Sequence, residues 1–176
     1  MASMHQLFHQ TSTDSANEEE GHIVAQLSWD LMDQTPTEDL FMFLVTEDST
    51  RVAGCIMFSR LKFLQQTNII SFLLAPVAVR TTHQKRGIGT ICWNKREPNT
   101  DLLVSYGDPN YYSKVGFQPV TTAVIPAPLP LSMPQGWLAL PLFVPNGYSI
   151  DTENELLCHG IEQEGALVRT TPKEDQ

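Results

Sequence analysis

The segment HQKRGIGT, residues 83–90, contains the residue types best suited to binding an anion. Lys85 and Arg86 bring two positive charges, and Gly87 and Gly89 follow at once. Glycine lets a backbone approach a ligand closely or take a positive φ. A helix that begins here would also present unpaired N–H groups and a partial positive charge to a phosphate. The segment predicts a phosphate-binding loop, although two glycines alone also suit a tight turn from a strand into a helix.

The run before this loop predicts a strand with an interrupted edge. NIISFLLAPVAVR, residues 68–80, is almost entirely apolar, as expected for a strand buried on both faces. Pro76 cannot donate a hydrogen bond to a neighbouring strand, so pairing should fail locally. Backbone groups left free there can pair with an extended ligand. A pyrophosphate in the loop and an amide-bearing arm along the strand describe a long molecule such as coenzyme A.

Three ordered motifs resemble the GNAT acetyltransferase superfamily. LAPVAVRTTHQKRGIGT, residues 74–90, resembles its signature of a strand, a short loop and Q/R-x-x-G-x-G/A. GDPNYYSKVGF, residues 107–117, resembles its second hallmark, a Tyr ahead of a Gly-Phe pair. Together with MPQGWLAL, residues 133–140, these runs are similar to bacterial YhbS-type N-acetyltransferases, and the resemblance covers roughly residues 4–143.

The resemblance implies acetyl-CoA as co-substrate and assigns residues to it. The CoA pyrophosphate would be cradled by the backbones of Gln84, Lys85, Arg86, Gly87, Ile88, Gly89 and Thr90. The pantetheine arm would pair with the backbones of Val77, Ala78 and Val79. Tyr112 has the spacing of the superfamily's proton donor to the CoA thiolate; the alternative is a core aromatic residue beside Phe117. Asp108 and Pro109 are expected to shape the turn, and Gly116 with Phe117 to be structural.

No general base and no metal site emerge from the sequence. The acids Glu18, Glu19 and Glu20, with His22 nearby, lie where the superfamily's substrate side begins, but they also suit a solvated helix start. His5 and His9 are four residues apart without a third ligand in the sequence nearby, which favours an exposed helix face. The three cysteines have no paired spacing, so neither a disulfide framework nor a zinc cluster is expected.

Composition narrows the class of protein. The chain has 176 residues, 41% of them hydrophobic, which is ordinary for one globular domain. A net charge of −9 argues against nucleic-acid binding. No apolar run is long enough to span a membrane and the start does not resemble a signal peptide, so we expect a cytoplasmic protein.

The pattern of the chain predicts an α/β or α+β fold with a mixed sheet flanked by helices. Two helical pieces occupy residues 4–33, the second capped by Asp14 or Ser15 and burying Ile23, Val24, Leu27 and Leu31. A short helix should run from Arg86 or Gly87 to Pro98, and another short helical piece should lie within 107–116. Strands are expected at 40–48, 51–63, 68–80, 101–106, 117–125 and 136–143, with a proline-rich loop at 126–134.

Three departures from the superfamily stand out. The opening strand is expected to be absent, the helix after the glycine loop is short, and the end of the chain does not match. We therefore expect a domain over residues 1–145 and a divergent, partly disordered segment over 146–176, with a short helix at 152–163. The exposed edge of the sheet would allow a second copy of the chain to pair with it, so a homodimer is one expectation. The favoured function is an N-acetyltransferase acting on a small-molecule or peptide amine. The alternative is a degenerate relative that binds CoA as a regulatory module without turnover.

Overall fold

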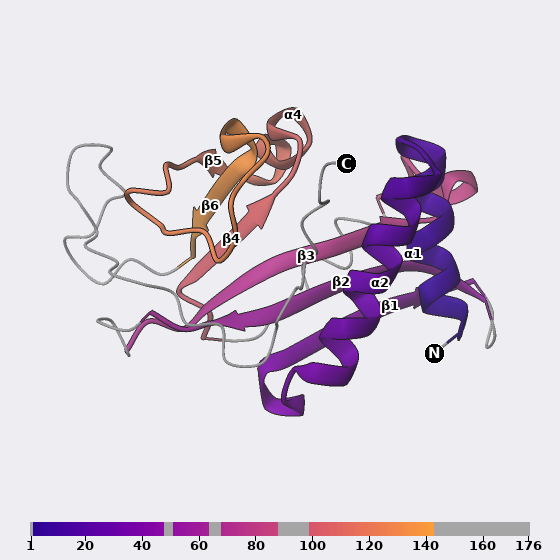
Figure 1. Ribbon diagram of the computed structural model, residues 1–176, viewed down its shortest axis with the longest axis horizontal. Coiled ribbons are helices and arrows are strands. Elements are labelled where there is room, and N and C mark those ends of the chain that lie inside the picture. The colour runs from indigo at the N-terminus through magenta and orange to yellow at the C-terminus, as the bar shows by residue number, and fades with distance from the viewer. Residues whose placement is uncertain (1, 48–50, 64–67, 88–98, 143–176) are drawn as a thin grey trace, which may run out of the picture.

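The computed structural model describes residues 2–47, 51–63, 68–87 and 99–142. Two helices open the chain, followed by a six-stranded sheet (Figure 1). The helices are α1 (Ala2–Ser15), α2 (Glu18–Gln34) and α4 (Pro109–Tyr112), and the 3-10 turns are η1 (Thr37–Asp39), η2 (Thr81–His83), η3 (Ser113–Val115) and η4 (Pro134–Gly136). The strands are β1 (Leu40–Thr46), β2 (Val52–Leu61), β3 (Ser71–Val79), β4 (Leu102–Tyr106), β5 (Gln118–Pro119) and β6 (Trp137–Pro141). None of the helices among these residues is long and apolar enough to cross a membrane.

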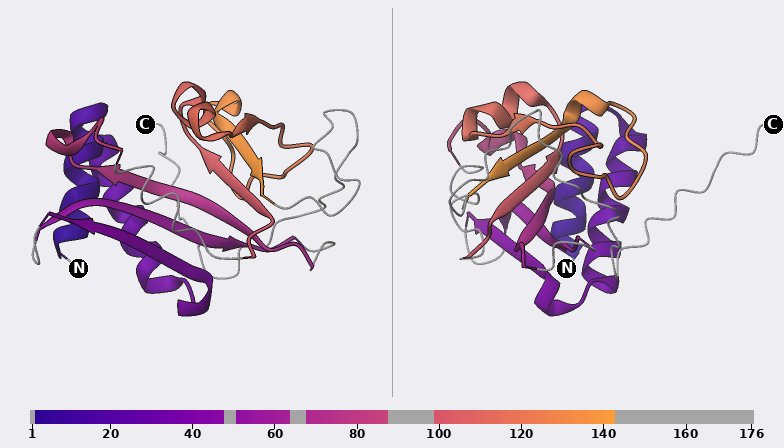
Figure 2. Two further views of the ribbon diagram at one scale, coloured as in Figure 1. Left: turned by 180° about the vertical axis from the view of Figure 1, so that it is seen from behind. Right: turned by 90° about the vertical axis from the view of Figure 1, so that its left-hand side faces the viewer.

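Helices α1 and α2 form a close pair against β2 and β3 (Figure 2). The two helical pieces expected within 4–33 are confirmed, with α1 running to Ser15 and α2 beginning at Glu18. The cap of α2 is neither Asp14 nor Ser15 but Asn17, whose side chain accepts a hydrogen bond from the Glu20 N–H at 2.9 Å. Acids in the first turn of α2 are favoured by the helix dipole, as expected.

The buried face of α2 differs from the expected apolar stripe. Its buried residues are Gly21, Ala25, Ser28 and Leu31, whereas Ile23 is 55% exposed. Gly21 is needed for this packing, since an added Cβ would lie 2.8 Å from the His9 carbonyl oxygen of α1. Helical periodicity finds a stripe of large side chains, but the close approach of two helices selects small ones.

The sheet is mixed, in the order β1-β2-β3-β4-β6-β5. Strands β3 and β4 are parallel, and the other neighbours are antiparallel. This confirms the α+β class and the strands expected around 40–48, 51–63, 68–80, 101–106 and 136–143. The strand expected over 117–125 is largely wrong, because β5 ends at Pro119 and a turn follows, in which Ile125 N–H donates to Thr121 O at 3.0 Å.

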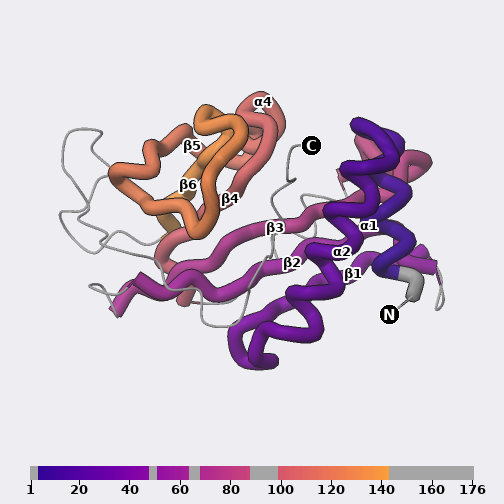
Figure 3. Tube along the Cα trace, in the orientation of Figure 1, coloured from indigo at the N-terminus to yellow at the C-terminus, as the bar shows by residue number. Residues whose placement is uncertain are grey.

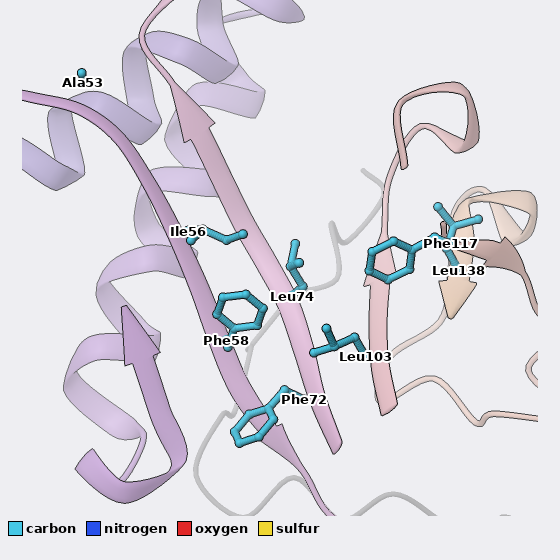
Figure 4. Packing of buried hydrophobic residues seen from close by; sticks show 8 residues of the cluster. All are labelled: Ala53, Ile56, Phe58, Phe72, Leu74, Leu103, Phe117 and Leu138. Atoms are coloured by element: carbon cyan, nitrogen blue, oxygen red, sulfur yellow. The ribbon is translucent and has the colours of Figure 1, made fainter. Parts of the chain in front are cut away.

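The sheet has apolar clusters on its two faces. One joins α1 and α2 to the sheet through Leu7, Phe8 and Met57. The other spans the central strands and holds Tyr112 and Val115 at its margin; its fully buried members are Ala53, Ile56, Phe58, Phe72, Leu74, Leu103, Phe117 and Leu138 (Figure 4). This second cluster fixes β3 and β4 relative to the segment that carries Tyr112.

Several expectations fall on residues outside those described. They are the short helix from Arg86 or Gly87 to Pro98 beyond its first residues, and the segment 146–176 with its helix at 152–163. The chain that is described opens on α1, and no strand precedes that helix among the described residues.

Candidate active site

The site begins where β3 and β4 separate. The two parallel strands pair from Ser71 with Leu102 to Leu74 with Ser105, and β3 then continues to Val79 beside β2 alone. The trace shows β4 leaving β3 at this level and turning toward α4 (Figure 3). The β2–β3 register also shifts between Ile56 and Phe58, opposite Pro76. The expected failure of pairing at Pro76 is confirmed.

Two of the three residues expected to pair with a ligand, Val77 and Val79, present their backbone groups at the open edge of β3. Arg80 N–H donates to Ala53 O of β2 at 2.8 Å, and backbone groups of successive strand residues point to alternate edges. Val79 and Val77 therefore direct their N–H and C=O groups away from β2, and Ala78 directs its own toward β2. This geometry suits Val77 and Val79 for pairing with an extended ligand and does not suit Ala78.

The loop after β3 is held by contacts that the sequence did not reveal. The Arg80 guanidinium donates to Val52 O at 3.1 and 3.2 Å. The Thr81 hydroxyl donates to the Asp14 carboxylate of α1 at 2.6 Å, and His83 lies 3.2 Å from Glu47. These contacts tie the start of the loop to α1, β2 and the end of β1. Nothing in the sequence marks Asp14 or Glu47 for this role, because both partners are distant along the chain.

The glycine loop has the backbone that its sequence predicts, as far as it is described. Gly87 has φ +79°, a left-handed conformation that glycine adopts freely, and Lys85 has φ +61°. An added Cβ at Gly87 would meet no atom of the described residues within 4 Å, so the space on their side is open. The Gln84 side chain donates to Val79 O at 3.1 Å and closes the end of β3. Ile88, Gly89 and Thr90 lie outside the described residues.

Positive charge is available beside this backbone. Lys85 and Arg86 are both exposed. Neither forms an ion pair with an acid in the part of the chain that the structure describes. Two exposed cations directly before a left-handed glycine suit a polyanionic group, which is the chemistry expected of this loop.

Tyr112 lies at the end of α4, in a segment with the expected turn chemistry. Asp108 caps α4, its carboxylate accepting from the Asn110 N–H at 2.9 Å, and Pro109 follows at the first helical position. Gly116 ends the segment with φ +99°, which confirms its structural role. The Tyr112 ring packs edge-on against Phe117 at 5.4 Å between centroids. It therefore has the contacts of a core aromatic residue in addition to its hydroxyl.

The hydroxyl of Tyr112 is at the point where β3 and β4 part. It hydrogen bonds with Ser105, the last β4 residue paired with β3. The Ser105 hydroxyl also donates to Leu74 O at 3.0 Å, which holds it against β3. Burial raises the pKa of Tyr112, Ser105 acts in the opposite direction, and Tyr111 adds a smaller increase. The pKa of Tyr112 thus lies above its ordinary 10.0, and the phenol is protonated at neutral pH.

Ser105 was missed by the sequence analysis. The only signal was a polar residue within an otherwise apolar strand, in the run LLVSY. The acids of α2 lie elsewhere: Glu18 contacts His9 and His22 at 3.4 and 3.6 Å. His9 and Glu18 were not expected to meet, because they lie on different helices.

Solved structures of acetyltransferases share this fold. The GNAT-family N-acetyltransferase YhbS of Escherichia coli, in complex with CoA, is 20% identical with a TM-score of 0.65, covering 81% of this chain and 76% of that one. A GNAT-family acetyltransferase of Staphylococcus aureus Mu50 is 16% identical with a TM-score of 0.61, covering 81% and 96%. One from Brucella melitensis, in complex with acetyl-CoA, is 20% identical with a TM-score of 0.54, covering 81% and 82%.

Comparisons of sequence find less. No protein-family model matches the chain, and no curated protein matches it. The structural likeness establishes the fold: the chain has the α+β fold of the GNAT acetyltransferases, with a mixed six-stranded sheet and two N-terminal helices.

Proposed function

We propose that this chain is an N-acetyltransferase that moves the acetyl group of acetyl-CoA to an amine. The observation that carries the proposal is the Tyr112 hydroxyl, held beside Ser105 where β3 and β4 separate. A proton donor at this point lies next to the open edge of β3, where an extended thioester would end. Structures that share the fold include one solved with CoA and one with acetyl-CoA, which supports this choice of ligand.

In this proposal the ligand lies along β3 and the glycine loop. The amides of the loop, from Gln84 to Thr90, would bind the pyrophosphate, with Lys85 and Arg86 supplying charge. The pantetheine amides would pair with the backbones of Val77 and Val79, in which the Val79 carbonyl already accepts from Gln84 and the Val79 N–H would make the contact. The fit rests on the left-handed Gly87 and on the space beside it.

Tyr112 would act as the general acid. The neutral amine nitrogen forms a bond to the thioester carbonyl carbon, and the carbon–sulfur bond breaks. The Tyr112 hydroxyl gives its proton to the departing thiolate, and the proton of the acetylated amine leaves to water. At neutral pH the phenol carries this proton, which it would give up as the carbon–sulfur bond breaks.

The acceptor we propose is a small-molecule or peptide amine in the cytoplasm, without nucleic acid or membrane. We also propose that the sheet lacks the opening strand of the GNAT fold and that the helix after the glycine loop is short. In the described residues β1 is an edge strand, and its Met42 and Leu44 are exposed. A homodimer would form by pairing of this edge with a second copy of the chain.

The test combines calorimetric titration with acetyl-CoA and a thiol-release assay over a panel of amines. We expect binding with turnover. We expect Tyr112→Phe to lower kcat by about 10²- to 10⁴-fold, the usual contribution of general acid catalysis, with CoA affinity little changed. Tyr111→Phe is the matched control, since Tyr111 is the neighbouring tyrosine and is 49% exposed.

Each outcome separates the candidate functions. Binding without turnover on any amine favours the regulatory CoA-binding module. Failure to bind CoA at millimolar concentration rejects both. Full kcat in a folded Tyr112→Phe variant, where chemistry limits the rate, removes Tyr112 from the mechanism.

A further inference from the structure

Three metal-ligating side chains meet between α1 and α2. His9 comes from α1, and Glu18 and His22 come from the first turns of α2. Each offers one ligand atom, and these atoms all lie within 4.8 Å of one another. The Nε2 atoms of His9 and His22 lie 3.4 and 3.6 Å from the same oxygen, Glu18 Oε1.

The two distances to Glu18 Oε1 match the edges of a tetrahedral metal site. Zinc binds histidine nitrogen at about 2.0–2.1 Å and carboxylate oxygen at about 2.0–2.2 Å. At such bond lengths two ligand atoms of a tetrahedral site lie about 3.4 Å apart. Two imidazoles and one carboxylate are also a ligand set that first-row divalent metals accept. We propose that His9, Glu18 and His22 form a binding site for a divalent transition metal such as Zn²⁺.

The fold builds the site from two features of packing. Glu18 and His22 are four residues apart on α2, so one helical turn places them on the same face. Gly21 brings that face against α1, since an added Cβ would lie 2.8 Å from the carbonyl oxygen of His9 itself. The rings of His9 and His22 consequently lie edge-on, with centroids 4.6 Å apart.

A metal can reach the cluster from solvent, and one coordination position stays open. His9 is a quarter exposed at 25%, and the side chains of Glu18 and His22 are exposed. Three protein ligands leave the fourth tetrahedral position to water. A bound metal would cross-link α1 to the start of α2. Because α1 also carries Asp14, which holds Thr81 ahead of the glycine loop, the cross-link would brace the helix that supports that loop.

The test is calorimetric titration of the full-length, tag-free protein with Zn²⁺, together with thermal melting with and without Zn²⁺. We expect saturable binding of one ion and a higher melting temperature in its presence, because a ligand bound only by the folded state stabilises that state. His9→Gln and His22→Gln should each raise the dissociation constant at least tenfold and abolish the shift in melting temperature.

Matched controls separate the site from scattered surface ligands. His5→Gln removes another histidine of α1, and Glu19→Gln removes the same charge next to Glu18; both should bind Zn²⁺ as the parent does. Glu18→Gln should weaken binding as the histidine variants do. Circular dichroism confirms that each variant is folded.

Two results would overturn the proposal. One is the absence of binding at millimolar Zn²⁺, which would leave the cluster as an ordinary set of ion pairs. The other is binding that is equally strong in the His9→Gln, His22→Gln and His5→Gln variants, which would place the ion elsewhere. The outcome does not depend on acetyl transfer, because neither readout uses CoA.

Discussion

Replacing Gly107 with alanine should impair the proposed acid without removing any of its atoms. Gly107 follows β4 and lies against the edge of the Tyr112 ring. An added Cβ would lie 2.6 Å from Tyr112 Cε2, whereas ordinary van der Waals contact begins at 3.4 Å. Gly107 does not have a positive φ, unlike Gly87 and Gly116, so the backbone tolerates alanine and the cost comes from the ring.

The size of the effect follows from the shift that the ring must make. The difference between 3.4 and 2.6 Å requires Tyr112 to retreat by about 0.8 Å. Phe117 packs on the same ring, so the retreat disturbs the core and should cost about 1–3 kcal/mol of stability, the usual cost of overpacking. A displacement of about 1 Å in a reacting group costs about 10²-fold in rate. We expect kcat to fall by about that factor, with CoA affinity nearly unchanged.

The assay is a double-mutant cycle with Tyr112→Phe. Turnover is measured by thiol release, CoA affinity by calorimetry and stability by urea unfolding. If Gly107→Ala acts through the hydroxyl of Tyr112, it should lower kcat in the parent and have little further effect in the Tyr112→Phe background. Its cost in stability should remain in both backgrounds, because the ring is present in both.

A folded Gly107→Ala variant that retains the parent kcat would contradict this prediction. An equal loss of kcat in the Tyr112→Phe background would also contradict it, because the effect would then come from another part of the site. A loss of CoA affinity equal to the loss of kcat would show that the substitution disturbs the ligand's position and leaves the acid untested as a separate group.

Three further predictions concern the loop and the helices. Gly87→Val should weaken CoA binding at least tenfold, or about 1.4 kcal/mol, as measured by calorimetry. Valine is strained at φ +79°, and its side chain would fill the space beside the loop. Unchanged affinity in a folded variant would make Gly87 an ordinary turn residue. Hydrogen bonds from the side chains of Thr81 and Gln10 hold the pKa of Asp14 below its ordinary 3.8, and the bond from Thr81 has the larger effect. The stability that Asp14 adds is therefore present above about pH 4 and is lost as the pH falls through the pKa of Asp14 in the folded protein. Urea unfolding of the parent and Asp14→Asn should therefore differ at pH 6 and converge near pH 3, and a constant difference would reject the linkage. Asn17→Ala should destabilise the protein by about 1 kcal/mol in the same assay through loss of the α2 cap, and an unaffected unfolding midpoint would contradict that role.

The motifs alone predicted the fold class and much of the site. Alternating and apolar runs gave the positions of the main strands, because burial on a sheet demands such runs wherever the chain goes. Gly87 could be assigned from sequence because a left-handed φ is a local property of the backbone. Pro76 could be assigned for the same reason, since proline lacks a donor in any context.

Other features required the tertiary structure, because they depend on pairs of residues distant in the chain. The hydroxyl of Ser105 meets Tyr112 only because β4 and α4 fold back on each other, and Asp14 reaches Thr81 only because α1 packs beside the end of β3. The buried face of α2 could not be read from its large apolar residues, because the close approach of α1 made Gly21 the residue that decides the packing. That same approach joined His9 to two residues of the next helix, which no spacing along a single helix can show.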